Sequence, residues 1–198
     1  ITASSGALTI CQGSAGAGKS ASMRCLSTAY HAEGFSVVGA AIAKTAAKNL
    51  TDSAGIDTHT VAKLLDSIKR GENILNDQTV LIVDEAGQIG TYQLAALLEA
   101  ADSAGSKVIL VGEDKQLDAI EHGGWLRFLS KNSAIPVARM QTIVRQNESW
   151  ARQAVAQLRD GNASAALKTH AELGLLNIEA DKNATHEKLL SQWKAYQQ

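Results

Sequence analysis

The chain has 198 residues, a net charge of −1 and two cysteines. This length allows one compact α/β domain, or one domain with a small appendage, and it is sufficient to bury a sizeable core. The near-neutral charge excludes an overall basic field for nucleic acid, so any such contact has to be local. The apolar runs at 80–83 and 108–111 are too short to span a bilayer, and residues 1–20 do not show the basic-then-apolar pattern of a signal segment. We therefore expect a cytoplasmic protein without membrane insertion. Because the chain begins at Ile1, we also expect it to be part of a longer protein.

A glycine-rich turn between a predicted strand and a predicted helix is the first motif in the chain. Residues 7–11 are apolar enough for a buried strand, and residues 21–26 continue a helix that should end near Gly34. Between them, the spacing Gly-x4-Gly-Lys-Ser meets the phosphate-binding P-loop pattern at every fixed position. Backbone N–H groups of such a loop, and the positive end of the following helix, bind phosphate oxygens. We predict that the phosphates of a nucleotide are bound by Gly13, Ser14, Ala15, Gly16, Ala17, Gly18, Lys19 and Ser20.

Two side chains of the loop and two carboxylates further on have predicted chemical roles. Lys19 would reach the β- and γ-phosphates, and the Ser20 hydroxyl would bind Mg²⁺. A buried strand at 79–83 ends in Asp84, a second Mg²⁺ ligand, and Glu85, which could activate the attacking water. The alternative for this acidic pair is an N-terminal cap for the helix that we expect over 88–104.

The other elements predict an α/β fold with a mostly parallel sheet flanked by helices. Apolar and β-branched runs at 35–42 and 107–112 are typical of buried parallel strands. Between the first of these and strand 79–83 we expect helices at 46–53 and 61–69, the second capped by Asp57 or Thr58. A short helix at 125–130 follows, then Pro136 at an edge or a strand start. Helical patterns at 147–160, 163–170 and around Leu189 predict a C-terminal helical extension.

Two later polar residues could meet the γ-phosphate. Gln116 follows the strand at 107–112, and its uncharged amide is suited to sensing whether the γ-phosphate is present. Arg145 lies in a late loop, from which an arginine could neutralise charge in the transition state. The alternative for Arg145 is an ordinary surface arginine.

Four ordered segments resemble helicase motifs I, II, III and IV of superfamily 1. The resemblance is closest to RecD-like helicases and, within them, to the helicase half of conjugative relaxases of the TraA/TraI type. The motif II-like segment reads Asp-Glu-Ala-Gly, and the motif III-like segment continues as Gln-Leu-x-Ala-Ile. One departure is Glu113, where the family usually has Asp. The four segments are residues 13–20, 82–89, 110–117 and 142–146.

This resemblance implies a first RecA-like motor domain over residues 1–146 and a helical extension over 147–198. The extension would lead to a second RecA-like domain, and a relaxase domain could precede the motor in the same longer chain. ATP and Mg²⁺ would be bound as described above, with Lys19, Glu85, Gln116 and Arg145 taking part in hydrolysis. The chain alone would be a weak ATPase, because the second domain is missing. Single-stranded DNA would be contacted by Lys44, Thr45, Thr58, His59 and Thr60.

Two alternatives remain at this stage. The chain could be a self-contained P-loop ATPase or kinase that does not act on DNA, although the motif III-like glutamine and the late Arg-Gln pair oppose this interpretation. It could also be a degenerate motor-domain copy that serves as a binding module. The intact set of Lys19, Ser20, Asp84 and Glu85 opposes that second alternative.

Overall fold

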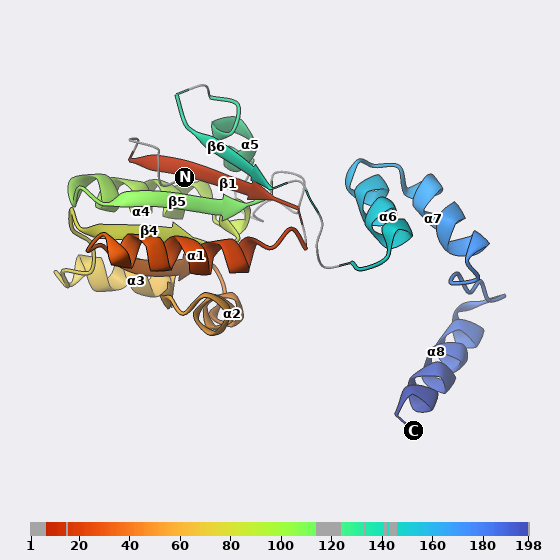
Figure 1. Cartoon of the computed structure of the whole chain (residues 1–198). Helices are drawn as coiled ribbons and strands as arrows, with labels where there is room; N and C mark the ends of the chain where they lie inside the picture. The colour runs from red at the N-terminus through yellow and green to blue at the C-terminus, as the bar shows by residue number, and fades with distance from the viewer. Residues whose placement is uncertain are drawn as a thin grey trace. The chain divides into compact units, whose positions relative to one another are not determined.

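The computed structural model describes residues 7–14, 16–113, 124–132, 134–140, 142 and 146–197. The chain divides into two compact units, residues 1–145 and 146–198. The first unit contains a six-stranded sheet in which every neighbouring pair of strands is parallel, in the order β3-β2-β4-β5-β1-β6. Figure 1 shows β4, β5, β1 and β6 side by side in this order. The strands are β1 (Leu8–Gly13), β2 (Ser36–Ala41), β3 (Asp57–Thr60), β4 (Thr79–Val83), β5 (Lys107–Gly112) and β6 (Val137–Met140).

Helices cover both faces of this sheet, which explains why its central strands are apolar throughout. Alternate residues of a strand point to opposite faces, so a strand covered on both sides reads as a continuous apolar run. In β4 every residue is buried: Leu81 and Val83 pack in one core cluster, while Val80 and Ile82 pack in the other. The first cluster includes residues of α3 (Val61–Lys69), α4 (Thr91–Ser103) and α5 (Trp125–Leu129), and the second includes residues of α1 (Lys19–Ala32) and α2 (Lys44–Ala54).

The expected elements of the first unit are confirmed for the strands at 8–13, 36–41, 79–83 and 107–112, and for the helix that follows the glycine-rich loop. The helix expected over 88–104 is wrong at its start. Residues Ala86–Gln88 form a 3-10 turn, η1, and α4 begins only at Thr91, after Gly90 in extended conformation. The 3-10 turn and the extended residues Ile89 and Gly90 therefore separate the acidic pair from α4.

The polar stretch at 57–60 is a further correction, because it forms strand β3, which the sequence did not predict. It pairs in parallel with β2, with Gly39 opposite Thr58. The expected cap by Asp57 or Thr58 is also wrong: the Thr60 side chain caps α3 by accepting a hydrogen bond from the Lys63 N–H at 3.2 Å. A four-residue polar edge strand lacks the apolar run that identifies buried strands, so the hydrophobic pattern gave no signal for it.

The second unit consists of three helices, α6 (Ser149–Arg159), α7 (Ala163–Glu172) and α8 (Lys182–Tyr196). Helices α6 and α7 contact each other, with the rings of Trp150 and His170 in an edge-to-face arrangement at 5.5 Å. Helix α8 begins with a side-chain cap, in which Asp181 accepts from the Ala184 N–H at 2.9 Å, but it contains no buried residue. Across the residues that the structure describes in both units, no helix has the length and apolar character needed to cross a membrane.

Candidate functional site

The glycine-rich loop connects the end of β1 directly to the start of α1. Gly16 and Gly18 have φ values of 79° and 80°, in the left-handed region that glycine adopts without a steric penalty. Gly18 is the N-cap of α1, where no side chain bonds the first N–H groups of the helix. A helix start of this kind, 14 residues long and reached through a glycine-rich loop, attracts an anion through its N–H groups and its dipole.

Lys19 lies across this loop. Its ammonium donates hydrogen bonds to the backbone carbonyls of Gly13 at 2.6 Å and Ser14 at 3.2 Å. A Cβ atom placed on Gly13 would come within 2.9 Å of the Lys19 Cγ, so a larger residue at position 13 would displace the lysine side chain. Gly13 is therefore needed for close packing, and Lys19 is held at the loop by the loop's own carbonyls.

Strand β6 contacts the glycine-rich loop, and the sequence did not predict this contact. The Ser14 N–H donates to the Met140 carbonyl at 3.4 Å, and Gly13 is paired with Met140 in the sheet. One residue earlier, the Arg139 Nε donates to Oε1 of the buried Gln12 at 3.2 Å. Pro136 was the only sequence signal for this strand, since four residues are too few to show a period.

Asp84 and Glu85 follow the last residue of β4. The Asp84 N–H donates to the Ala40 carbonyl at 2.8 Å, which continues the sheet pairing by one residue, and the Asp84 carboxylate accepts the Glu85 N–H at 2.9 Å. Glu85 has φ 50° and ψ 36°, and it is the only residue other than glycine with positive φ in the described part of the chain. This conformation costs about 1 to 2 kcal/mol for a side chain with a Cβ.

The surroundings of these carboxylates make their charged forms costly. Burial raises the pKa of Asp84, against the opposing effects of the Glu85 N–H and the Lys19 charge. Burial also raises the pKa of Glu85, and the neighbouring Asp84 charge raises it further, while Lys19 lowers it. A cation placed among these groups would favour both ionised carboxylates.

The loop and the acidic pair lie at the same edge of the sheet, because all six strands are parallel and these residues follow strand ends. Strand β5 lies between β1 and β4: Gln12 is opposite Gly112, and Val83 is opposite Leu110. Glu113, directly after β5, stands between the two groups in the strand order. The arrangement brings the loop from β1 into α1 and the two carboxylates to one edge of the sheet.

The residues expected to contact DNA lie at this edge as well, on β3 and at the start of α2. Lys44 and Thr45 are exposed, and His59 is half-buried with its Nε2 atom 3.7 Å from the Asp57 carboxylate. Thr58 and Thr60 have structural contacts. The Thr58 hydroxyl donates to the Ile56 carbonyl at 2.8 Å, and that of Thr60 caps α3.

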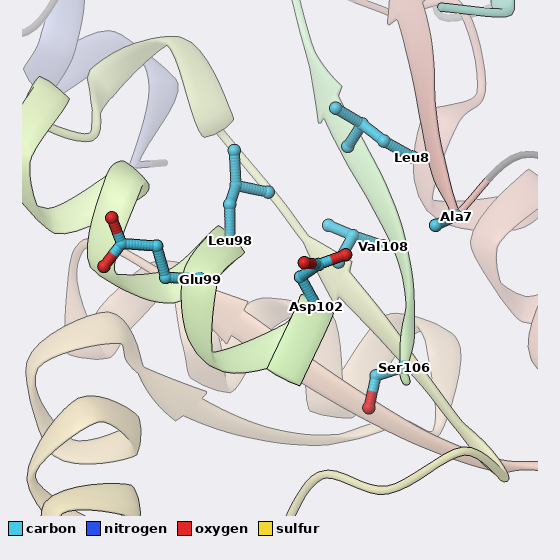
Figure 2. Close-up of a pocket in the computed structure, with 7 residues that line it drawn as sticks. All are labelled: Ala7, Leu8, Leu98, Glu99, Asp102, Ser106 and Val108. Carbon is cyan, nitrogen blue, oxygen red and sulfur yellow. The ribbon is translucent and has the colours of Figure 1, made fainter. Parts of the chain in front are cut away.

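Three of the predicted site residues, Ala15, Gln116 and Arg145, lie outside the residues that the structure describes. Within the described residues, no three His, Cys, Asp or Glu side chains form a group that could hold a metal by themselves. A pocket of about 320 Å³ lies near the opposite edge of the sheet, where β1 and β5 begin, and Figure 2 shows α4 along one side of it. It is lined by Ala7, Leu8, Leu98, Glu99, Asp102, Ser106 and Val108 and belongs to no predicted site.

The parallel sheet and the loop from β1 into α1, with the acidic pair after β4, place the chain in the P-loop class of α/β proteins. Its sequence matches the profile of the AAA domain family over residues 1–181, and the chain belongs to this family.

Three relatives confirm the resemblance stated from the motifs. The chain is 38% identical over 181 residues to the conjugal transfer protein TraA of Rhizobium radiobacter, covering 91% of this chain and 16% of that protein. It is 30% identical over 175 residues to the multifunctional conjugation protein TraI of Escherichia coli K12, covering 84% and 10% of the two chains. It is 31% identical over 143 residues to the ATP-dependent RecD2 DNA helicase of Deinococcus radiodurans, covering 70% and 20%. The chain thus spans only a small part of each of these proteins.

Proposed function

We propose that this chain is the first ATP-hydrolysing motor domain of a DNA helicase, within a longer protein of conjugative DNA transfer. The observation that carries the proposal is the position of Lys19 and the acidic pair Asp84-Glu85 at one edge of the parallel sheet. The similarity to TraA, TraI and RecD2 supports the DNA-motor role. A motor of this kind would work in the cytoplasm, where both ATP and DNA are present.

In this proposal the loop residues 13–20 bind the triphosphate. The N-terminus of α1 offers N–H groups to the phosphates, and Lys19 exchanges its contacts with the loop carbonyls for contacts with the β- and γ-phosphates. Glu85, two residues beyond the end of the buried strand β4, orients and deprotonates the attacking water. Its raised pKa is consistent with a group able to accept a proton. Gln116 and Arg145 would respond to the γ-phosphate.

The donors at this edge fit Mg²⁺. This ion prefers oxygen ligands and is usually held by one or two carboxylates together with substrate phosphates, not by a complete protein cage. The Ser20 hydroxyl and the Asp84 carboxylate supply two oxygen donors of this type, and the described residues form no larger cluster. The bound ion would neutralise charge on the phosphates.

The DNA and the rest of the longer chain are the proposed partners. Exposed Lys44 and Thr45, with His59 nearby on β3, would contact the phosphates of single-stranded DNA along the sheet edge. The second unit supports a contact with the rest of the protein, because large apolar side chains are exposed on it. They are Leu158, Leu167, Leu173, Leu175, Leu176, Ile178, Leu189, Leu190, Trp193 and Tyr196.

The nucleotide site is tested by calorimetry of Mg-ATP binding to Lys19→Ala. We expect affinity to fall by about 100-fold or more, since the substitution removes a charged partner of the phosphates. Lys69→Ala, at the exposed end of α3, is the matched control and should bind as the wild type does. Equal affinity in folded Lys19→Ala would contradict the site.

The motor role is tested by phosphate release from the 198-residue chain, with and without single-stranded DNA. We expect slow turnover and weak, salt-sensitive DNA binding, because arginines from a second domain are worth about 10³-fold or more in related phosphoryl transfer. Robust DNA-stimulated turnover by the monomeric chain would instead favour a self-contained ATPase. Phosphoryl transfer to a small acceptor would favour a kinase.

A further inference from the structure

The turn that follows Glu85 is held by a helix distant in the sequence. Within η1, the Gln88 N–H donates to the Glu85 carbonyl at 2.9 Å, and the Ile89 N–H donates to the Ala86 carbonyl at 3.1 Å. The carbonyl of Ile89 in turn accepts the indole N–H of Trp125 at 2.8 Å. Trp125 is the first residue of α5, 36 positions further along the chain.

The hydrogen bond from Trp125 is buried and sits in the apolar core. Trp125 is 8% exposed, and Ile89 and Ala86 are completely buried in the same cluster. A buried indole N–H needs an acceptor, so its direction fixes both the ring and the carbonyl that it contacts. An aliphatic side chain could fill the same space without fixing the turn.

The next residue of α5, Leu126, also packs near the turn. Leu126 lies against two glycines: a Cβ on Gly112 would approach its Cδ2 atom to 2.9 Å, and a Cβ on Gly87 to 3.5 Å. Gly112 ends β5 and Gly87 is in the middle of η1. Helix α5 therefore packs both against the end of β5, where a Cβ on Gly112 would collide with Leu126, and against the turn after Glu85.

We propose that Trp125 is a positioning residue for Glu85, which it keeps in its left-handed conformation by fixing the exit of the 86–89 turn. Glu85 is the residue that departs from ordinary backbone geometry, and this departure persists only if the surroundings impose it. The two hydrogen bonds of η1 transmit the constraint from Ile89 back to Glu85. The inference rests on the proposed function, in which Glu85 activates the attacking water.

The test compares Trp125→Phe, which keeps an aromatic ring but loses the N–H donor, with Phe128→Ala. Phe128 is on the same helix but 73% exposed, so it is a matched control that leaves the turn untouched. Two quantities are measured: hydrogen exchange at the Gln88 and Ile89 amides, and the rate constant of ATP hydrolysis in single turnovers with excess protein. A merely structural role would change the fraction of active protein but not this rate constant.

In Trp125→Phe we expect exchange at both amides to be about 10-fold faster or more, with exchange in α1 unchanged. We expect the hydrolysis rate constant to fall about 10-fold or more, because small displacements of a catalytic group are costly, while the Mg-ATP dissociation constant stays within about twofold. Phe128→Ala should match the wild type in all of these. Unchanged exchange or an unchanged rate constant in Trp125→Phe would overturn the proposal.

A second test uses the wild-type protein alone, so it does not depend on whether Trp125→Phe folds. If Trp125 and the turn form one unit, the indole N–H proton should have the same protection factor as the Gln88 and Ile89 amides, each relative to its own intrinsic exchange rate. An indole protection factor 10-fold lower than those of the two amides would overturn the proposal. Failure of the proposed function is distinguishable, because it would appear as absent Mg-ATP binding in the wild type, and the exchange measurements would still decide whether Trp125 holds the turn.

Discussion

Strand β4 and helix α8 both contain large apolar residues, but those of β4 are buried and those of α8 are not. Every residue of β4 is buried, because helices pack on both faces of the sheet. Helix α8 contains Leu189, Leu190 and Trp193, yet none of its residues is buried. In the whole second unit, the buried apolar side chains of the described residues are Ala154 and Ala166. The first unit thus carries its own core, while the second exposes the side chains from which a core could form.

This difference teaches that helix formation and helix burial are separate events. Local signals define α8, such as the Asp181 cap and the absence of glycine or proline inside it. Burial of its apolar residues would require a partner surface, and most helical stability in proteins comes from such packing. The contrast supports the proposal that the rest of a longer chain covers the second unit. The predictions below test this contrast, in order of decreasing expected effect.

The largest effect is expected for a core residue of the first unit. Leu81 is completely buried in β4, so Leu81→Ala should lower the free energy of unfolding by about 2 to 5 kcal/mol through lost burial and a residual cavity. Urea denaturation followed by tryptophan fluorescence, to which Trp125 in the same cluster contributes, measures this loss. A loss below about 1 kcal/mol would mean that the sheet is not the stable core.

Glu85→Gln should affect chemistry and leave the fold intact. The amide keeps the size of the side chain but cannot accept the proton of water, so turnover should fall by about 10²-fold or more. That factor corresponds to about 2.7 kcal/mol in the activation barrier. Calorimetry should show unchanged Mg-ATP affinity, and phosphate release measures the rate. Near-normal turnover would move the catalytic base to another residue.

Asp84→Asn should stabilise the protein measured without nucleotide. Burial raises the pKa of Asp84 in the folded state. The protonated carboxyl therefore contributes stability that is fully present below the unfolded pKa of about 3.9. This stability is lost as the pH rises through the folded pKa, where the buried carboxyl has to ionise. Asparagine does not ionise, so the variant keeps this stability at high pH. Its side-chain oxygen can still accept the hydrogen bond from the Glu85 N–H. Its denaturation midpoint should therefore exceed the wild-type value at pH 7, with the difference vanishing at acid pH.

The control is Asp52→Asn, at an exposed position on α2. Its denaturation midpoint should equal the wild-type midpoint at every pH measured. The same Asp84→Asn substitution should weaken the dependence of ATP binding on Mg²⁺, which calorimetry with varied Mg²⁺ measures. A variant less stable than the wild type at pH 7 would show that the carboxylate is compensated in the folded state.

The smallest effect is expected in α8. Leu189 is 64% exposed, so Leu189→Ala should change the unfolding free energy by no more than about 0.5 kcal/mol. It is the matched partner of Leu81→Ala, because both variants remove the same atoms from a leucine. A loss as large as that of Leu81→Ala would mean that α8 is packed in solution, and the contrast between the units would fail.

The sequence determined the fold class and much of the site. The apolar runs at 79–83 and 107–112 predicted buried parallel strands because burial on both faces removes any polar alternation. The spacing of Gly13, Gly18, Lys19 and Ser20 predicted the phosphate loop, since each type is required by local backbone or side-chain chemistry. Asp84 and Glu85 could be placed at the loop's edge of the sheet because they directly follow such a strand.

Only the tertiary structure decided which distant segments support these residues. Strand β3 is polar and owes its existence to pairing with β2, where Thr58 packs over Gly39. The support of the loop by Met140, and the bond from Trp125 to the Ile89 carbonyl, join residues far apart in the chain. The left-handed backbone of Glu85 has no local sequence signal, because no residue near it requires that conformation by itself. Local patterns fix what each segment can form, whereas packing between segments selects the geometry of the site.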